Sequence, residues 1–339
     1  MARPKIGVIG CGSIGKRHTK NLLAIGACTP SELVAFDLAA GARAEVEALG
    51  VATVDTLDAL LDLAPELVVV ASPTSKHVEH AIAAAERGCH LFVEKPVAER
   101  HDGELDRLIA IVEEKRLVTL VGCNLRFHPG LRRIKAMLAE GRIGRVVMAR
   151  VQFGYWLADW RPNTDYRTGY GAHKAMGGGV ILDAIHELDY VRWLMGEVTS
   201  VAAFADHLSP KLEIDTEDSA AIILRFASGA LGEVHLDYVQ RAYTRNCWLV
   251  GDGGTLAWDY PSPEVRLFDP KTKAWEVSSS VPSWDPNDMY LDEARHLAAC
   301  LTGKEESEQT IADGARVLDL AIAAKDSAAK TVFVDLPRS

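Results

Sequence analysis

The amino-acid sequence predicts an α/β protein of two domains: an N-terminal doubly wound parallel sheet, then an α+β domain with a large, open, mostly antiparallel sheet. Three observations support this prediction. In the first third of the chain, short apolar runs alternate with helical stretches. Later runs are longer, rich in β-forming residues and mostly without helices between them. The 339 residues also exceed what one hydrophobic core usually serves.

The first domain is expected at residues 1–122. Helical segments such as Val78–Arg87 and Glu104–Lys115 lie between its apolar runs. Strands that alternate with helices are joined by crossover connections, which make a parallel sheet. The buried strands are expected at Ile6–Ile9, Leu33–Phe36, Leu67–Ala71, Leu91–Val93 and Leu117–Val121.

The second domain, residues 123–339, is expected to bind substrate and to form subunit contacts. Helices are expected at Leu125–Glu140, Val180–Leu194, Asp288–Leu301 and Ala312–Lys325. Several of the strands follow one another with turn signals between them, which is typical of an antiparallel sheet. The strands are expected at Val146–Phe153, Val198–Ala205, Ser219–Phe226, Ala230–Tyr238, Cys247–Val250, Thr255–Trp258 and Thr331–Leu336.

A glycine motif, Gly10-Cys11-Gly12-Ser13-Ile14-Gly15, follows the first strand and opens a helix. Gly10 permits a tight turn, Gly12 lets the backbone approach a pyrophosphate, and Gly15 lets the helix pack against the strand. The helix N-terminus adds free N–H groups and the positive end of its dipole. The motif therefore predicts a dinucleotide-binding Rossmann domain, with Ser13 and Ile14 also at the cofactor.

Asp37 stands at the end of the second strand. A carboxylate at this place accepts hydrogen bonds from the ribose hydroxyls of the adenosine half and repels a 2′-phosphate. We therefore expect NAD rather than NADP. The alternative interpretation is a residue that caps the turn.

Ser72, Pro73 and Thr74 follow the strand at Leu67–Ala71, where small and hydroxyl side chains suit a nucleotide that passes over the sheet edge. The alternative is a plain turn into a helix capped by a hydroxyl side chain. His77 is also expected at the cofactor. His77 and His80 lie three apart on the following helix, but nothing supplies the other ligands of a metal site, so no metal is expected and solvent-facing or capping histidines are the alternative.

Glu94-Lys95-Pro96 follows the next strand, at the edge expected to face the cofactor. A lysine there hydrogen-bonds a substrate oxygen and stabilises the negative charge that develops on it. Glu94 is expected to orient the lysine, tune its charge and lie at the cofactor. Pro96 fixes the exit of the backbone. The alternative is an exposed ion pair before a turn.

Four motifs, taken in order, resemble the Gfo/Idh/MocA family, which includes glucose–fructose oxidoreductase, inositol dehydrogenase and many sugar and nucleotide-sugar dehydrogenases. They are the glycine motif at 10–15, Glu94-Lys95-Pro96, the segment Gly122–Pro129 and the glycine-led segment Gly177–Asp189. They spread over most of the chain. The resemblance implies an NAD-dependent dehydrogenase that acts on a sugar, sugar acid, cyclitol or nucleotide sugar.

The resemblance also implies that Lys95 and His186 are the principal polar catalytic residues. Hydride transfer at a carbinol carbon needs a group that exchanges the hydroxyl proton near neutral pH, and a histidine does so. A histidine packed against the sheet is the alternative. Many family members place a catalytic aspartate four positions before this histidine, whereas Asp183 stands three before it. On one continuous helix the shorter spacing turns the aspartate by about 100 degrees. Asp189 is expected to be structural.

A stretch from Tyr155 to Arg167 interleaves aromatic residues with Asp and Arg. Aromatic faces suit the C–H faces of sugar rings, and arginines bind a carboxylate or phosphate at two points. A surface loop or subunit contact is the alternative, because Trp, Tyr and Arg are enriched there too. The expected substrate contacts are Tyr155, Trp160, Arg161, Arg167 and Lys174, together with Lys95, Asn124, Arg126 and His186.

The net charge of −10 argues against a nucleic-acid partner, which requires clustered Lys and Arg. No apolar run approaches membrane-spanning length, and the N-terminal residues lack the pattern of a signal peptide. Six scattered cysteines fit reduced thiols in the cytoplasm. An open sheet must cover its outer face, and members of the family that the chain resembles cover it by forming dimers or tetramers. The resemblance therefore implies a homodimer or homotetramer.

Two other functions are compatible with the sequence. One is a glycoside hydrolase that uses tightly held NAD for transient oxidation, as some relatives do. The other is a non-catalytic dinucleotide-binding module that reports redox state to a partner. The presence of both Lys95 and His186 argues against the module.

Overall fold

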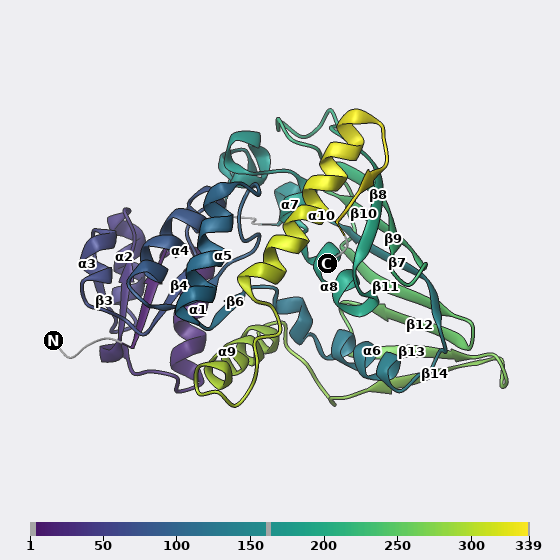
Figure 1. Cartoon of the computed structure of the whole chain (residues 1–339), viewed down its shortest axis with the longest axis horizontal. Helices are drawn as coiled ribbons and strands as arrows, with labels where there is room; N and C mark the ends of the chain where they lie inside the picture. The colour runs from purple at the N-terminus through teal and green to yellow at the C-terminus, as the bar shows by residue number, and fades with distance from the viewer. Residues whose placement is uncertain (1–4, 161–163, 338–339) are drawn as a thin grey trace. The chain divides into compact units, whose positions relative to one another are not determined.

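The computed structural model describes residues 5–160 and 164–337 and divides the chain into two compact units (Figure 1). Unit 1 comprises Met1–Asn124 and Asn287–Arg316, and unit 2 comprises Leu125–Pro286 and Val317–Ser339. From the sequence, Asn287–Arg316 was predicted to belong to the second domain, residues 123–339. The structure assigns it to unit 1, because Ala294 and Leu297 of this segment join the apolar core beneath the first helix.

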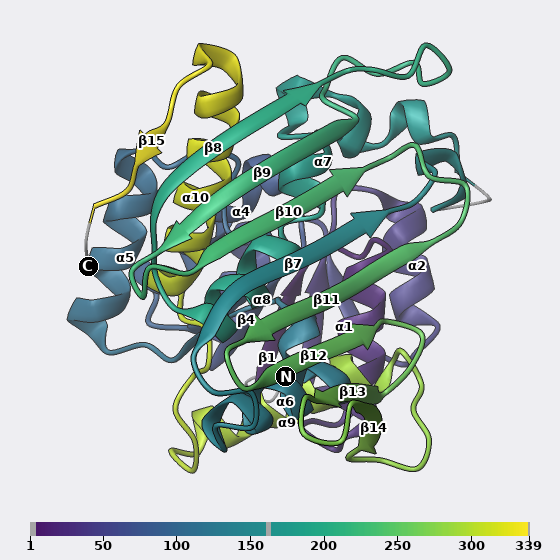
Figure 2. The same ribbon diagram turned by 90° about the vertical axis from the view of Figure 1, so that its right-hand side faces the viewer.

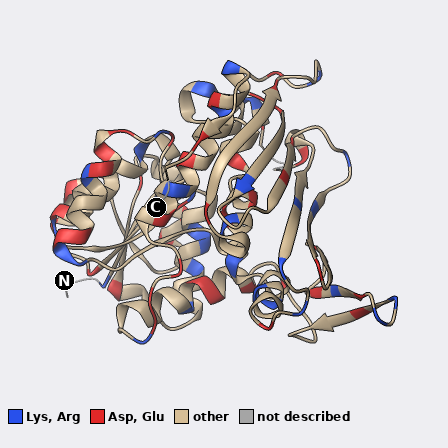
Figure 3. Ribbon diagram, turned by 45° about the vertical axis from the view of Figure 1, so that its right-hand side comes forward, with Lys and Arg blue, Asp and Glu red and all other residues tan. Residues whose placement is uncertain are grey.

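Unit 1 contains a six-stranded parallel sheet in the order β3-β2-β1-β4-β5-β6. Its strands carry no Asp, Glu, Lys or Arg, whereas the surrounding helices do (Figure 3). The strand order reverses beside β1, and ligands of such sheets bind at the carboxyl ends of the strands there. The strands are β1 Ile6–Ile9, β2 Leu33–Phe36, β3 Ala52–Val54, β4 Leu67–Val70, β5 His90–Val93 and β6 Thr119–Val121.

The helices of unit 1 pack in neighbouring pairs. Helix α4 lies beside α5, and α1 lies beside α9 (Figure 1). Helix α9 belongs to the later segment, Asn287–Arg316, with which the chain re-enters unit 1. The predicted Rossmann domain is confirmed, and only the short, partly exposed β3 was missed among the strands. The helices are α1 Ser13–Ala24, α2 Ala40–Glu47, α3 Leu57–Leu61, α4 His77–Glu86, α5 Gly103–Lys115 and α9 Asp288–Leu301.

Unit 2 contains a nine-stranded sheet in the order β14-β13-β12-β11-β7-β10-β9-β8-β15 (Figure 2). Only β7 and β10 are paired in parallel, so the predicted mostly antiparallel sheet is confirmed. The strands are β7 Val146–Gly154, β8 Val198–Asp206, β9 Ser219–Phe226, β10 Leu231–Asp237, β11 Thr244–Gly251, β12 Gly254–Asp259, β13 Glu264–Asp269, β14 Ala274–Ser279 and β15 Val334–Asp335.

One face of this sheet is covered and the other is open. Alternate residues of β9 are buried, as expected for a strand with one side in a core. Helix α8 contacts β7 and β10 and lies behind the sheet in Figure 2. The helices of this unit are α6 Pro129–Ala139, α7 Val180–Asp183, α8 His186–Met195 and the main part of α10 Ile311–Lys330. The predicted strands at 146–258 are all present, whereas β13 and β14 were missed.

Candidate active site

The glycine motif forms a tight turn between β1 and α1. Gly10 has a φ of +98°, and a Cβ there would lie 2.5 Å from the carbonyl oxygen of Ala71. A Cβ at Gly15 would lie 1.9 Å from the carbonyl oxygen of Gly10, so both positions require glycine. A Cβ at Gly12 would meet nothing within 4 Å. The open position is the one at which a pyrophosphate is expected to approach the backbone.

Asp37 lies at the end of β2, beside this turn. Its carboxylate accepts hydrogen bonds from the Cys11 N–H at 2.7 Å and from the Ala39 N–H at 2.8 Å. The Arg43 guanidinium donates to the Asp37 backbone carbonyl at 2.7 Å. Asp37 therefore caps the turn and also holds a fixed, partly exposed carboxylate where the adenosine ribose is expected. The turn, the helix start and the carboxylate together fit NAD.

His77 connects the ends of β4 and β5 and is only 2% exposed. Its Nδ1 lies 2.8 Å from the Pro96 carbonyl oxygen, and its Nε2 lies 2.8 Å from the Ser72 carbonyl oxygen. Burial lowers its pKa, and the two carbonyl contacts oppose this shift. Both ring nitrogens of His77 face backbone carbonyl oxygens, and its expected contact with the cofactor stays a prediction. The Ser72 hydroxyl is 2.9 Å from His80 Nδ1, and Thr74 is buried.

Lys95 is the one residue of Leu91–Ala98 that is not buried. Glu94 Oε1 lies 2.6 Å from His18 Nε2, and Oε2 accepts the Lys95 backbone N–H at 3.1 Å. Burial raises the pKa of Glu94, but the His18 contact and the Lys95 charge outweigh it and hold this pKa below its usual value. Glu94 thus contacts Lys95 through the backbone N–H of the lysine. His18 was missed, although it stands three positions after the last glycine of the motif.

The sequence predicted one helix for the segment that carries Asp183 and His186, and this prediction was wrong. Helix α7 ends at Asp183, Ala184 has φ −93° and ψ 33°, and α8 begins at His186. The three-residue spacing therefore spans a break and does not place the two side chains on one helical face. His186 is partly exposed, whereas its neighbours on both sides are buried.

Two tyrosines hold the Asp183 carboxylate. The Tyr170 hydroxyl donates to Oδ1, and the Tyr238 hydroxyl donates to Oδ2 at 3.1 Å. Burial raises the pKa of Tyr238 well above its usual value, and the Asp183 charge adds to this effect, so Tyr238 remains a donor. The tyrosine at 170 was not singled out in the sequence.

The Arg126 guanidinium, which was expected at the substrate, faces the Asp189 carboxylate. Its Nε and Nη2 donate to both carboxylate oxygens of Asp189, at 2.6 to 3.2 Å, and it is 4% exposed. This geometry gives the pair a structural role, as expected for Asp189. Asn124 is also buried, and its expected contact with substrate stays a prediction.

One residue of the aromatic stretch at 155–167, Trp160, contacts a tyrosine that holds the Asp183 carboxylate. The Trp160 ring packs edge-on against Tyr238 with centroids 5.2 Å apart, and Tyr155 packs against Tyr243 at 5.5 Å. Arg167 donates to the Asp165 carboxylate at 2.8 to 3.1 Å, so its guanidinium is engaged within the loop. Lys174 is exposed, and Arg161 lies outside the described residues.

Family models match both parts of the chain. The model described as an oxidoreductase family with an NAD-binding Rossmann fold matches residues 4–123, and that of the GFO/IDH/MocA C-terminal domain matches residues 131–257. A myo-inositol 2-dehydrogenase of Thermotoga maritima is 30% identical, over 95% of this chain and 96% of that protein. An uncharacterized oxidoreductase of Bacillus subtilis, YrbE, is 30% identical, over 95% and 94%.

Solved structures agree with these relatives. Levoglucosan dehydrogenase in complex with NADH and levoglucosan superposes with a TM-score of 0.89 at 25% identity, covering 99% of this chain and 100% of that one. Fold, glycine turn and matching family models define an NAD-dependent oxidoreductase. The chain belongs to the Gfo/Idh/MocA family.

Proposed function

We propose that this enzyme oxidises a secondary hydroxyl, or reduces the corresponding carbonyl, of a sugar, sugar acid, cyclitol or nucleotide sugar. The observation that carries the proposal is the setting of Lys95 and His186, each a partly exposed polar residue between buried neighbours. Relatives named for inositol and levoglucosan support the substrate class.

The proposed chemistry divides between these two residues. Bound NAD supplies a hydride acceptor, and NADH a donor. The Lys95 ammonium donates a hydrogen bond to the substrate oxygen and favours the negative charge that builds on it. His186 accepts the hydroxyl proton during oxidation and returns it during reduction. The buried His18–Glu94 pair holds the Lys95 backbone in place.

A spectrophotometric screen tests the function. Purified enzyme and NAD are mixed with sugars, uronic acids, cyclitols and nucleotide sugars, and NADH formation is followed at neutral pH. Lys95→Ala and His186→Ala should each lower kcat by about 10²- to 10⁴-fold and leave the Kd for NADH nearly unchanged. Lys115→Ala, on the exposed side of α5, serves as the control with full activity.

Other outcomes of this screen separate the alternatives. Cleavage of an aryl glycoside without net NADH would replace the dehydrogenase with an NAD-dependent hydrolase. Binding of NADH without turnover of any compound would favour the redox-reporting module. Full activity in Lys95→Ala would overturn the site assignment.

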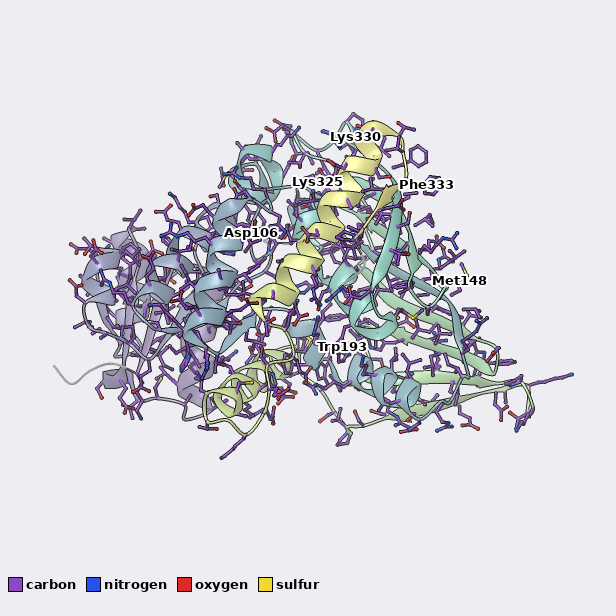
Figure 4. The ribbon with its side chains drawn as sticks, in the orientation of Figure 1. Asp106, Met148, Trp193, Lys325, Lys330 and Phe333 are labelled. Carbon is purple, nitrogen blue, oxygen red and sulfur yellow. The ribbon has the colours of Figure 1, made fainter. Side chains whose placement is uncertain are left out.

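The open face of the nine-stranded sheet is the proposed subunit contact. Apolar side chains on this face are exposed, including Phe204 (74%), Ile223 (47%) and Met148 (42%). Met148 and Phe333 point away from the helices of unit 2 (Figure 4). We propose that a second copy covers this face in a homodimer or homotetramer. Sedimentation of the wild type and of Ile223→Lys tests this proposal, which predicts a smaller species for the variant.

The proposed compartment is the cytoplasm. All six cysteines are buried thiols, as expected where thiols stay reduced. Among residues 5–160 and 164–337, no helix is long and apolar enough to cross a membrane. Fractionation of the native host with an antibody against the enzyme tests the assignment.

A further inference from the structure

Helix α8 begins at His186 directly after a break in the chain. Helix α7 ends at Asp183, and the residue before α8 is Ile185, whose apolar side chain cannot accept a hydrogen bond from the N–H groups at a helix start. The neighbouring backbone therefore does not by itself fix the first turn of α8. Because His186 is the first residue of this turn, its position depends on what else holds the turn.

Two fully buried carboxylates hold the first turn of α8. Glu187 Oε1 accepts a hydrogen bond from Arg245 Nε at 2.7 Å. Asp189 accepts from Arg126 in the pair described above. Successive residues of a helix are about 100° apart, so the side chains at 187 and 189 leave the axis about 200° apart. Anchors on two sides fix the rotation of the turn, and His186 is the residue of this turn that stays partly exposed.

Arg245 is itself held firmly in the sheet behind which α8 lies in Figure 2. It belongs to β11 and pairs with Phe153 of β7. Its guanidinium carbon lies 4.4 Å from the centre of the Phe153 ring and 5.5 Å from that of Tyr260. Burial alone would lower the pKa of Arg245, but the Glu187 charge outweighs burial and raises this pKa. Arg245 is thus a charged, fixed group that connects the sheet with the residue after His186.

We propose that Arg245 and Glu187 are positioning residues that hold His186 in place for proton transfer. This inference rests on the proposed function, in which His186 exchanges the hydroxyl proton. Glu187 follows His186 directly, so a shift of its carboxylate also moves the backbone that carries the histidine. Displacement of a catalytic group by about 1 Å can lower the rate by about 10²-fold. The pair therefore acts on the chemical step and not on the affinity for the cofactor.

The test makes the same substitution near the two ends of α8. Arg245→Lys keeps the charge but loses the planar guanidinium that contacts both the aromatic rings and the carboxylate. Arg192→Lys is the matched control. Arg192 is 8% exposed and donates to the Glu197 carboxylate at 2.5 and 3.0 Å, in the last turn of the helix. Both variants should have a lower Tm than the wild type, because each weakens an ion pair of a buried arginine.

Only the substitution beside His186 should affect turnover. With the best substrate of the screen, Arg245→Lys should lower kcat by about 10- to 100-fold and leave the Kd for NADH within about 2-fold. Arg192→Lys should keep kcat within about 2-fold of the wild type. The single-turnover rate of NADH formation, measured by stopped flow, should fall together with kcat in Arg245→Lys. A merely structural role of Arg245 would lower the Tm and leave this rate unchanged.

Two substitutions of Glu187 distinguish position from charge, and they carry the test if Arg245→Lys does not fold. Glu187→Gln removes the charge but keeps an oxygen that accepts the hydrogen bond from Arg245. Glu187→Ala removes both. If position is what matters, Glu187→Gln should keep kcat within about 3-fold of the wild type, whereas Glu187→Ala should lose about 10- to 100-fold.

The outcomes are distinct. If the wild type is active and Arg245→Lys keeps its full kcat at a lowered Tm, the assignment of Arg245 is overturned and the dehydrogenase function stands. Equal losses of kcat in Glu187→Gln and Glu187→Ala would also overturn positioning, in favour of an effect of charge. If the wild type oxidises no polyhydroxylated compound with NAD, the proposed function fails and the assignment of the pair fails with it.

Discussion

Substitution of Gly12 by alanine separates cofactor binding from folding. Gly12 has φ −66° and ψ −171°, a conformation that alanine adopts without strain. Its added Cβ would meet no protein atom within 4 Å. The stability of Gly12→Ala should therefore match the wild type, or rise by up to about 1 kcal/mol, because alanine restricts the unfolded chain.

The affinity for NADH should fall in the same variant. The added methyl group keeps the pyrophosphate from the backbone N–H groups at the start of α1. A hydrogen bond to a charged group contributes about 1.5–3 kcal/mol, so loss of one such bond raises Kd by about 10- to 150-fold. NADH fluorescence titration measures the Kd, and differential scanning fluorimetry without cofactor measures the Tm.

Gly15→Ala is the contrasting variant. Its Cβ would lie 1.9 Å from the Gly10 carbonyl oxygen, so the turn must move before the helix can form. We expect this variant to lose about 1–3 kcal/mol of stability even without cofactor. If Gly12→Ala instead binds NADH as tightly as the wild type at an unchanged Tm, the glycine turn does not hold the pyrophosphate and the reasoning fails.

Three further predictions concern charge. Arg126→Met should cost about 3–5 kcal/mol in urea unfolding, because it leaves the buried Asp189 carboxylate without its guanidinium; the double variant with Asp189→Leu should recover most of this loss. Asp37→Ser should raise the NADP-to-NAD ratio of kcat/KM by about 100-fold, because the repulsion of a 2′-phosphate is removed; an unchanged ratio would contradict the role of Asp37. Burial lowers the pKa of His128 from 6.5 to about 3. Since the unfolded chain binds this proton first, stability should fall by about 1.4 kcal/mol between pH 7.5 and 5.5, and His128→Gln should lack that slope.

Much of unit 1 could be predicted from local sequence. The glycine turn and Asp37 each follow a buried strand directly, and Lys95 follows β5 after one residue, Glu94. The carboxyl ends of parallel strands meet at one edge of the sheet. Backbone conformation is set locally by residues such as Gly10, whose φ of +98° other residues rarely adopt. The predicted positions therefore required only that the strands be recognised.

Contacts between distant residues could not be predicted in this way. His18 and Glu94 are 76 positions apart, and Tyr238 meets Asp183 across 55 positions. The break after Asp183 could not be predicted from the sequence either, because the apolar residues of this segment fit one continuous helix. Both contacts and the helix break depend on tertiary packing, which a local reading of the sequence does not include.

By itself, the sequence predicted the cofactor and, through its resemblance to the family, the class of chemistry, because the glycine motif and the proposed site residues Asp37, Lys95 and His186 can be recognised from their local sequence. Only the tertiary structure decided how those groups are held. In the folded chain the Arg126 guanidinium donates to Asp189, and the Tyr170 hydroxyl donates to Asp183. The ring nitrogens of His77 contact carbonyl oxygens that follow two strands, β4 and β5. The physical reason is that a buried polar group must find its hydrogen-bond partner wherever the packed fold provides one, at whatever distance along the chain.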